Sequence, residues 1–255
     1  MQAIIIGAGR GIRLMPTTTD TPKCFAEVDG KSILDWSLKA LRAADINEIC
    51  FIGGYQIDKV RELHPELTYR HNDNWQNNNI LASLFYAEDL MEGPFICCYS
   101  DILFSPRVVE TLLASKDDIA LVVDTGWAAR YKHRTEHPPT DAEKVTILDG
   151  EVSRIHREIE VQDAYGEYIG MAKFSAQGAA RLNHHYHRCR AQYSAQPFRE
   201  AKLFEKAYKI HLFQEMIEAG ERMAHVDTPG EYIEVDTQED FEYARTYWTT
   251  RHLRR

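Results

Sequence analysis

The chain has 255 residues, 44% of them hydrophobic, which suffices for a sizeable core in one large α/β domain or two small ones. Lysine and arginine total 30 against 39 acidic residues, and the net charge of -9 includes no basic tail or stripe, which argues against a nucleic-acid partner. No run approaches the ~18 apolar residues of a membrane helix, and no charged-then-apolar leader opens the chain, so we expect a cytoplasmic protein without membrane contact.

The first half alternates short apolar runs with helical patterns, which is typical of βαβ units and of a mostly parallel sheet flanked by helices. The predicted strands are Ala3–Ile6, Glu48–Gly53, Leu67–Asn72, Pro94–Tyr99 and Ile119–Asp124. A capping box, Ser32-Ile33-Leu34-Asp35, predicts the start of the first helix. The further predicted helices are Gln56–Leu63, Ile80–Leu90 and Pro106–Ala114.

The alternation of short apolar runs with helical patterns stops after the fifth predicted strand. Two apolar runs flank Asp149-Gly150, so we expect a β-hairpin that a third strand extends into a small inserted sheet. The segments concerned are Lys144–Leu148, Val152–Ile155 and Glu167–Phe174. Beyond them we predict a helix, one or two strands and a closing helix over Leu203–Ala219, His225–Val235 and Gln238–Trp248. No internal repeat or Pro/Gly-rich linker interrupts the chain, which favours one domain over residues 1–255.

The cysteines and a histidine-rich stretch carry no clear site. The cysteines lack C-x-x-C spacing and three lie in apolar runs, which predicts reduced, mostly buried thiols for Cys24, Cys50, Cys97, Cys98 and Cys189. A polar stretch brings together His184, His185, His187 and Cys189. Because no matching ligand pair occurs elsewhere, a solvated helix face is favoured there over a metal site.

A glycine-rich segment, GAGRGIRLMP, follows the first predicted strand from Gly7 to Pro16. Three glycines within five residues let a backbone pass close to a ligand and turn where a β-carbon would clash. A dinucleotide-binding fingerprint needs a third glycine where this chain has Ile12, and a P-loop needs Gly-Lys-Ser/Thr where it has Gly11-Ile12-Arg13. Both familiar phosphate loops are therefore disfavoured.

Two prolines, Pro16 and Pro22, keep this loop from starting a long regular helix, so it is expected to wrap over a ligand. Arg13 and Lys23 then bring two cations about ten residues apart, which suits a nucleoside triphosphate. In this interpretation the glycine amides approach the α- and β-phosphates, and Arg13 neutralises the β/γ end. Lys23 lies between the α-phosphate and an incoming anion. A nicotinamide dehydrogenase does not account for these prolines and this lysine.

Gly-x-Gly-x-Gly-x-Arg-Leu, a proline, a threonine-rich stretch and Pro22-Lys23 resemble the signature of the nucleotidyltransferases that activate sugar phosphates and phosphocholine. The resemblance covers essentially the whole chain and is most specific in its first 35 residues, although Thr17-Thr18 stands where Leu-Thr is usual. It implies a Rossmann-like nucleotidyltransferase fold, with residues 1–124 as the nucleotide-binding half and 125–255 as the acceptor-binding half. It also implies catalytic roles for Arg13 and Lys23, and nucleotide contacts from Gly7, Ala8, Gly9, Arg10 and Gly11.

Nucleotidyl transfer moves a phosphoryl group between anionic oxygens, so a divalent cation, Mg²⁺, is expected. The resemblance puts one magnesium-binding aspartate at Asp101, at the end of the fourth predicted strand, where ligands gather in open α/β sheets. It puts the second at Asp236, just before the closing helix; Asp227 and Glu234 are weaker candidates. The alternatives are a turn cap for Asp101, and a helix cap at Asp236 or Thr237.

An amide-rich stretch runs from Asn72 to Leu84. Amides both donate and accept, as recognition of a pyrimidine edge requires. The pattern Asn-Asn-x-x-x-Ser-Leu, which includes Asn78, Asn79 and Ser83, resembles the phosphocholine cytidylyltransferase branch, so CTP is the expected nucleotide. Capping of the next helix by Asn78 or Asn79 is the alternative.

The acceptor site is expected in the second half, where three stretches resemble the same branch. The expected contacts are Trp127, Arg130, Tyr131, Lys132, Arg134, Glu143, Lys144 and Tyr168. Aromatic side chains permit choline, whereas the cations beside them favour a more anionic acceptor, and a charged solvent face is the alternative for the basic run.

The expected activity is therefore a cytidylyltransferase that couples CMP from CTP to a small phosphonate and releases pyrophosphate. The acceptor oxygen would attack the α-phosphate in line with the help of Mg²⁺. Phosphocholine is the nearest alternative acceptor, and a sugar 1-phosphate follows. A non-catalytic nucleotide sensor would be free to lose Lys23, Asp101 or Asp236, and this chain keeps all three.

Overall fold

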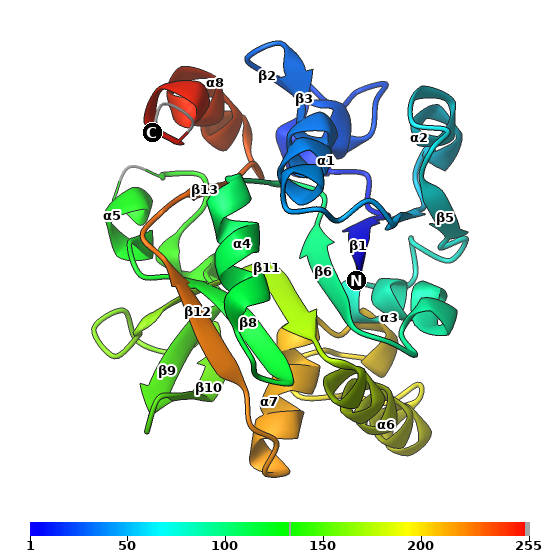
Figure 1. The fold of residues 1–255 in the computed structure, drawn as a ribbon, viewed down its shortest axis with the longest axis vertical. Helices are drawn as coiled ribbons and strands as arrows, with labels where there is room; N and C mark the ends of the chain where they lie inside the picture. Colours follow the sequence, from blue (N-terminus) through cyan, green and yellow to red (C-terminus); the bar gives the residue numbers. More distant parts are fainter. Residues whose placement is uncertain (133, 253–255) are drawn as a thin grey trace.

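The computed structural model describes residues 1–132 and 134–252. Within them a nine-stranded sheet draws on both halves of the chain (Figure 1). Its strands are β1 (Gln2–Gly7), β4 (Ile49–Gly53), β5 (Thr68–His71), β6 (Phe95–Tyr99), β8 (Ile119–Asp124), β9 (Lys144–Leu148), β10 (Glu151–His156), β11 (Gly166–Phe174) and β12 (Ala224–Thr228). The order is β10-β9-β11-β6-β1-β4-β5, and β8 pairs with both β11 and β12.

The sheet combines a parallel part with an antiparallel one. β1 pairs in parallel with β4 and β6, and β5 continues this part. β11 runs antiparallel to β6, β8 and β9. The predicted α/β class is confirmed, but the expected inserted sheet joins the main sheet because the hairpin β9–β10 pairs with β11. Two small sheets form from β2 (Glu27–Val28) with β3 (Lys31–Ser32), and from β7 (Ile102–Phe104) with β13 (Tyr232–Glu234).

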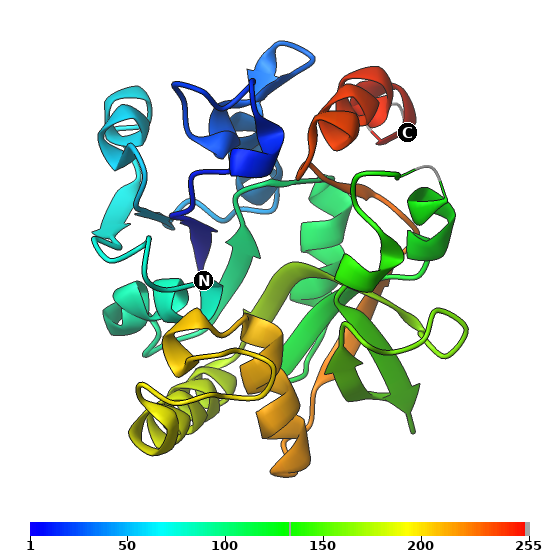
Figure 2. The same cartoon turned by 180° about the vertical axis from the view of Figure 1, so that it is seen from behind.

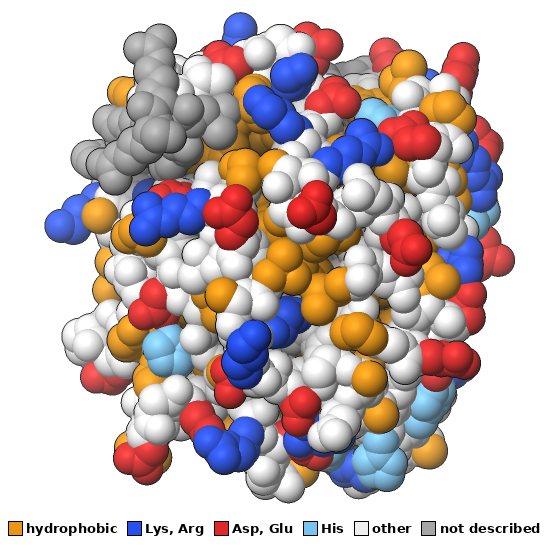
Figure 3. Space-filling model, in the orientation of Figure 1, with side chains coloured by type: hydrophobic (Ala, Val, Ile, Leu, Met, Phe, Trp, Pro, Cys, Tyr) orange, Lys and Arg blue, Asp and Glu red, His pale blue; other side chains and the backbone are white. Residues whose placement is uncertain are grey.

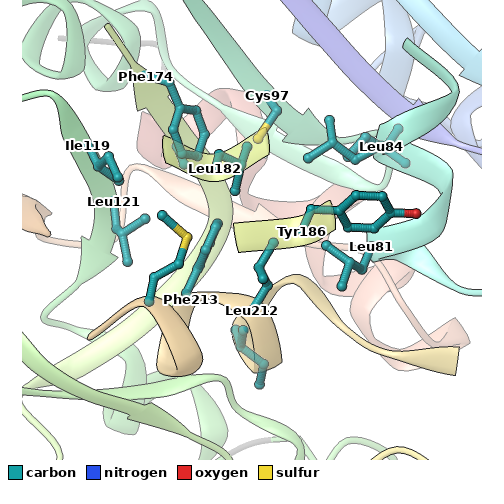
Figure 4. Close-up of a cluster of buried hydrophobic side chains, with 14 of the residues drawn as sticks. Leu81, Leu84, Cys97, Ile119, Leu121, Phe174, Leu182, Tyr186, Leu212 and Phe213 are labelled. Atoms are coloured by element: carbon teal, nitrogen blue, oxygen red, sulfur yellow. The ribbon is translucent and has the colours of Figure 1, made fainter. Parts of the chain in front are cut away.

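Helices cover both faces of the sheet, as Figures 1 and 2 show from opposite sides. One face carries α1 (Ile33–Ala43), α2 (Ile57–Leu63) and α4 (Pro106–Ala114), and the other carries α3 (Ile80–Leu84), α6 (Ala176–Tyr193) and α7 (Lys209–Glu218). Alternating residues of β1 serve the two faces: Ala3 and Ile5 pack on the first, and Ile4 and Ile6 on the second. Figure 4 shows the second core, where Leu81, Leu182 and Phe213 converge from the three helices.

The structure confirms several predicted local signals. Ser32 Oγ accepts from the Asp35 amide at 3.0 Å, and Asp35 Oδ2 accepts from the Ser32 amide at 3.2 Å, so the capping box forms. Asp149 and Gly150 have positive φ values of 53° and 81°, which suits the tight hairpin turn. The closing helix α8 spans Gln238–His252.

Other elements differ from their predictions. The predicted helix Ile80–Leu90 divides into α3 and a 3-10 segment (Phe85–Leu90), and this segment is itself kinked at Ala87, where φ is -110° and ψ is 24°. The predicted helix Leu203–Ala219 begins as α7 only at Lys209, since the two residues before it are extended. The helix α5 (Trp127–Tyr131) had no predicted counterpart, and α6 was anticipated only as a helix face around His184 and Cys189.

The states of the cysteines and the distribution of charge on the surface can be compared with what the sequence predicts. All five cysteines are buried with free thiols. On α6, His185 lies 3.1 Å from Glu221 and His187 contacts Glu88, and His185 and Cys189 are buried, so the expected solvated face holds only for part of this stretch. None of the described helices combines the length and apolar character that crossing a bilayer demands. Acidic and basic side chains intermingle on the face drawn in Figure 3.

Candidate active site

A cleft of about 750 Å³ opens at the carboxyl ends of β1 and β6. Ligands of open α/β sheets gather at this edge. Four cationic side chains line it: Arg10, Arg13, Lys23 and Arg157. Six carboxylates line it as well: Asp101, Asp141, Glu143, Glu167, Glu234 and Asp236. The cations of the lining are thus matched by its acids and cannot by themselves neutralise a triphosphate, which favours entry together with a cation.

The glycine-rich loop forms one wall of the cleft, and two of its glycines are needed for close packing. A β-carbon on Gly7 would lie 2.5 Å from Oγ of Ser100, the residue that follows β6. Gly11 has a φ of +70°, and a β-carbon there would lie 2.8 Å from Lys23 Cβ. Gly11 thus lets the loop rest on the stem of Lys23, which fixes where the ammonium emerges.

Lys23 connects the two predicted metal-binding carboxylates. Its Nζ lies 2.7 Å from Asp101 Oδ2 and 2.5 Å from Asp236 Oδ1. Burial alone would lower the pKa of Lys23, but the two carboxylates outweigh it and raise the pKa. Burial would conversely raise the pKa of Asp236, but Lys23 and Arg13 hold it below its usual value. Asp236 and Lys23 are therefore both charged at neutral pH.

The pair Asp101 and Asp236 fits a hard divalent cation. Carboxylate oxygens are the ligands that Mg²⁺ prefers. Oδ1 of Asp101 is buried and has no hydrogen-bond partner among residues 1–132 and 134–252, so one ligand atom is unused. Asp236 is not the cap of α8; that role belongs to Thr237, whose Oγ1 accepts from the Asp240 amide at 3.2 Å.

A histidine that the sequence did not single out lies beside Asp236. Ligand atoms of His137, Glu234 and Asp236 all fall within 4.8 Å of one another. Burial would lower the pKa of His137, but Asp240 and Glu234 outweigh it and raise the pKa. Burial and the charge of Asp236 raise the pKa of Glu234. His137 and Glu234 thus form a second polar cluster next to Asp236.

The amide-rich segment brings Asn78 and Ser83 to the cleft. Asn72 is buried and exchanges two amide hydrogen bonds with Asn78, at 2.8 and 2.9 Å, and also donates to Ser83 Oγ at 2.9 Å. Asn79 lines the cleft too, but its Oδ1 accepts from the Ile80 amide at 2.8 Å and caps α3. The segment thus holds Asn78 in one orientation before any ligand arrives.

The cleft also combines tyrosines with buried charges. Tyr99, Tyr168 and Tyr208 line it together with Glu143 and Arg157. Arg157 Nη2 lies 3.3 Å from Glu143 Oε1, and its guanidinium stands 4.1 Å from the ring centre of Tyr208. Glu143 and Tyr168, both expected acceptor contacts, are therefore in the cleft.

Six other expected acceptor contacts lie outside the cleft lining: Trp127, Arg130, Tyr131, Lys132, Arg134 and Lys144. The basic run after β8 pairs instead with buried acids. Arg130 contacts Asp124 and Glu167, and Arg134 lies 2.7 Å from Asp240. Lys144 donates to the Pro139 carbonyl at 2.8 Å. His133, in the same run, lies outside the described residues. Asp227, a weaker metal candidate, pairs with His225.

Some cleft residues had no sequence signal. His137 and Arg157 are single charged residues between predicted elements, and long-range pairing alone places them in the cleft. Trp75 and Gln76 also line the cleft. Their place in the amide-rich stretch, beside Asn78 and Asn79, could have indicated this from the sequence.

The sequence profile of the MobA-like NTP transferase domain matches residues 3–192. A CTP:phosphoglutamine cytidylyltransferase from Campylobacter jejuni is 31% identical over 252 residues, covering 95% of this chain and 98% of that protein. A choline-phosphate cytidylyltransferase from Streptococcus pneumoniae is 31% identical over 107 residues, covering 41% of this chain and 46% of that protein.

A solved structure shows the same fold at low sequence identity. The inositol-1-phosphate CTP transferase from T. maritima superposes with a TM-score of 0.74 at 19% identity. The match covers 98% of this chain and 96% of that one.

Proposed function

Because the chain belongs to the family of MobA-like NTP transferase domains, we propose that it transfers CMP from CTP to a small acceptor bearing a phosphonate, phosphate or phosphoramidate group. The position of Lys23 between Asp101 and Asp236, at the mouth of the glycine-rich loop, carries this proposal. It joins one cation that can meet phosphate oxygens to two carboxylates suited to Mg²⁺.

In the proposed reaction, an oxygen of the acceptor's phosphorus group attacks the α-phosphorus of CTP. The bond from that phosphorus to the oxygen bridging to the β-phosphate breaks, and pyrophosphate leaves with the bonding electron pair. The protein supplies no nucleophile. Its contributions are the orientation of both anions and the stabilisation of charge in the transition state.

Each charged residue has a defined part in this scheme. Lys23 exchanges a carboxylate partner for an oxygen of the α-phosphate, and Arg13 neutralises the β/γ end. Asp101 and Asp236 would hold Mg²⁺, which supplies further neutralisation of the phosphate oxygens. Asn78, held by Asn72, offers donor and acceptor atoms to the edge of a pyrimidine.

The relatives support the choice of nucleotide and the class of acceptor. The C. jejuni and S. pneumoniae relatives and the T. maritima protein are each named for cytidylyl or CTP transfer to a small molecule that carries a phosphate. For this chain a phosphonate, with phosphocholine as the alternative, was the expectation from sequence. The C. jejuni relative adds a phosphorylated amino acid to that set.

The experiment is a matrix of pyrophosphate release. CTP, UTP, ATP, GTP and dTTP are each combined, with Mg²⁺, with phosphoglutamine, 2-aminoethylphosphonate, phosphocholine and glucose 1-phosphate, and conjugates are identified by mass spectrometry. We expect activity in the CTP row alone, with a CMP conjugate as product. Activity confined to UTP or dTTP with the sugar phosphate would contradict the proposed nucleotide. The absence of a conjugate with every combination of nucleotide and acceptor would contradict the proposed function.

A further inference from the structure

An oppositely charged pair lines the cleft beside three tyrosines and takes no part in the contacts between Lys23, Asp101 and Asp236. Arg157 and Glu143 both line the cleft, with 3.3 Å between Nη2 and Oε1. Nε of Arg157 is buried and finds no hydrogen-bond partner in the described part of the chain. The described residues therefore leave part of the donor capacity of Arg157 unused.

Tyr208 orients the guanidinium, whose centre stands 4.1 Å from the ring centre. A planar guanidinium held on an aromatic face presents its edge in a fixed direction. That edge offers parallel N–H donors, the geometry that recognises a carboxylate. Arg157 is thus pre-oriented for an anionic group other than the reacting phosphorus group.

Glu143 offers the complementary charge. Its Oε2 accepts from the Tyr99 hydroxyl at 3.4 Å and its Oε1 from Arg157 at 3.3 Å, both long contacts for a carboxylate. Burial raises the pKa of Glu143 against the opposing effect of Arg157. A carboxylate accepts about four hydrogen bonds, so Glu143 has capacity for an ammonium group.

The neighbouring tyrosines are already occupied by an internal cation. Nζ of Lys209 lies 4.1 Å from the ring centre of Tyr99 and 5.4 Å from that of Tyr168, and donates to the Gly170 carbonyl at 3.0 Å. Lys209 is fully buried. A quaternary ammonium has no N–H group, so it could donate no hydrogen bond to Glu143, whereas a primary ammonium could.

We propose that Arg157 and Glu143 form a subsite for a zwitterionic α-amino acid head group, with the acceptor's carboxylate on Arg157 and its ammonium on Glu143. The acceptor is then a phosphorylated or phosphonylated amino acid. This inference rests on the proposed function, because the head group belongs to the molecule whose phosphorus group reacts beside Lys23. Glutamine, the parent of the acceptor named for the C. jejuni relative, carries such a head group.

The test compares four acceptors: phosphoglutamine, its α-N-acetyl derivative, its analogue without the α-carboxylate, and phosphocholine. For the native protein we expect kcat/KM to be highest for phosphoglutamine, and lower by about 30- to 100-fold when either charge is missing. Equal use of phosphocholine would overturn the inference.

Arg157→Gln should raise the KM for phosphoglutamine about 30- to 100-fold and leave the KM for CTP within about twofold. The same substitution should change the KM for the analogue without the carboxylate only slightly. Glu143→Gln should likewise change the KM for the N-acetyl derivative only slightly. Arg157→Lys should recover part of the loss, and Arg154→Gln, on the exposed side of β10, is the matched control.

Two outcomes distinguish the inference from the proposed function. Conjugates formed from CTP with all acceptors equally, or an Arg157→Gln loss that is the same for every acceptor, would overturn the subsite alone. The absence of a CMP conjugate with any acceptor would overturn the proposed function, and the subsite with it. Thermal unfolding of each variant checks that the change in KM does not reflect lost folding.

Discussion

Nζ of Lys23 lies 2.5 Å from Oδ1 of Asp236, a carboxylate 213 residues further along the chain. The two side chains are mostly buried, and the exposed fraction of each is 9%. This ion pair therefore connects the glycine-rich loop of the first half to the segment that precedes the closing helix. Substitutions at either residue should alter both the site and the stability of the fold.

Lys23→Ala should lower kcat/KM by about 10²–10³ while leaving the protein folded, because the variant loses a cation placed for the developing phosphate charge. Pyrophosphate release at saturating CTP and Mg²⁺ measures the loss. Lys202→Ala, at an exposed position, should behave as the native protein. Near-native turnover of a folded Lys23→Ala would remove Lys23 from the mechanism.

Asp101→Asn and Asp236→Asn should both abolish most of the Mg²⁺-dependent activity, and chelation by EDTA should do the same to the native protein. Their stabilities should differ. Asp236 pairs with Lys23 and Arg13, whereas Asp101 pairs with Lys23 alone among the described residues, so only Asp236→Asn should lower the free energy of unfolding by about 3 kcal/mol.

Urea unfolding with and without Mg²⁺ measures this difference. The native protein should gain stability from Mg²⁺, and both variants should gain less. Equal stabilisation of all three proteins by Mg²⁺ would place the cation elsewhere.

The sequence was most informative where function needs a local motif. Lys23 and Arg13 could be singled out because both lie in one contiguous loop with a recognisable motif. The family profile and the C. jejuni relative confirm the resemblance of the chain to nucleotidyltransferases and to their cytidylyltransferase branch. The βαβ pattern and the capping box at Ser32 gave the fold class for the same reason, since both depend on spacing within short segments.

Pairing across the fold could not be read from spacing. A run of cations after β8 indicates charge but not its partners, and here the partners Asp124 and Asp240 come from other elements. Arg157 has no motif around it, yet contacts with Glu143 and Tyr208 hold it in the cleft. The helix α6 lacked a strong apolar stripe because its outer face carries histidine and arginine residues.

Arg130→Gln tests this distinction between pairing and acceptor contact. Asp124 is fully buried, and burial raises its pKa against the effect of Arg130, so removing the guanidinium leaves an uncompensated carboxylate. We expect the free energy of unfolding to fall by about 3–5 kcal/mol, and the KM for the acceptor to stay within about twofold. A raised acceptor KM with native stability would restore Arg130 as an acceptor contact. Arg190→Gln, at an exposed position of α6, is the control.

His211 should make stability depend on pH. Its Nδ1 accepts from the Tyr208 amide at 3.2 Å at the start of α7, and Glu200 lies 3.4 Å from Nε2. Burial lowers the pKa of His211 from 6.5 to about 4, although Glu200 opposes the shift. The unfolded chain therefore binds this proton more readily, and the contribution of the neutral imidazole is present above about pH 6.5 and lost as the pH falls toward 4.

His211→Asn keeps a hydrogen-bond acceptor and removes the titration. Between pH 7 and pH 5 the native protein should lose about 2 kcal/mol more stability than this variant, as measured by urea unfolding at each pH. His184→Asn, at an exposed position of α6, should follow the native pH dependence. Parallel curves for native and His211→Asn would mean that the pKa of His211 is the same in the folded and the unfolded chain, so that the contact with Glu200 fully offsets the effect of burial at the start of α7.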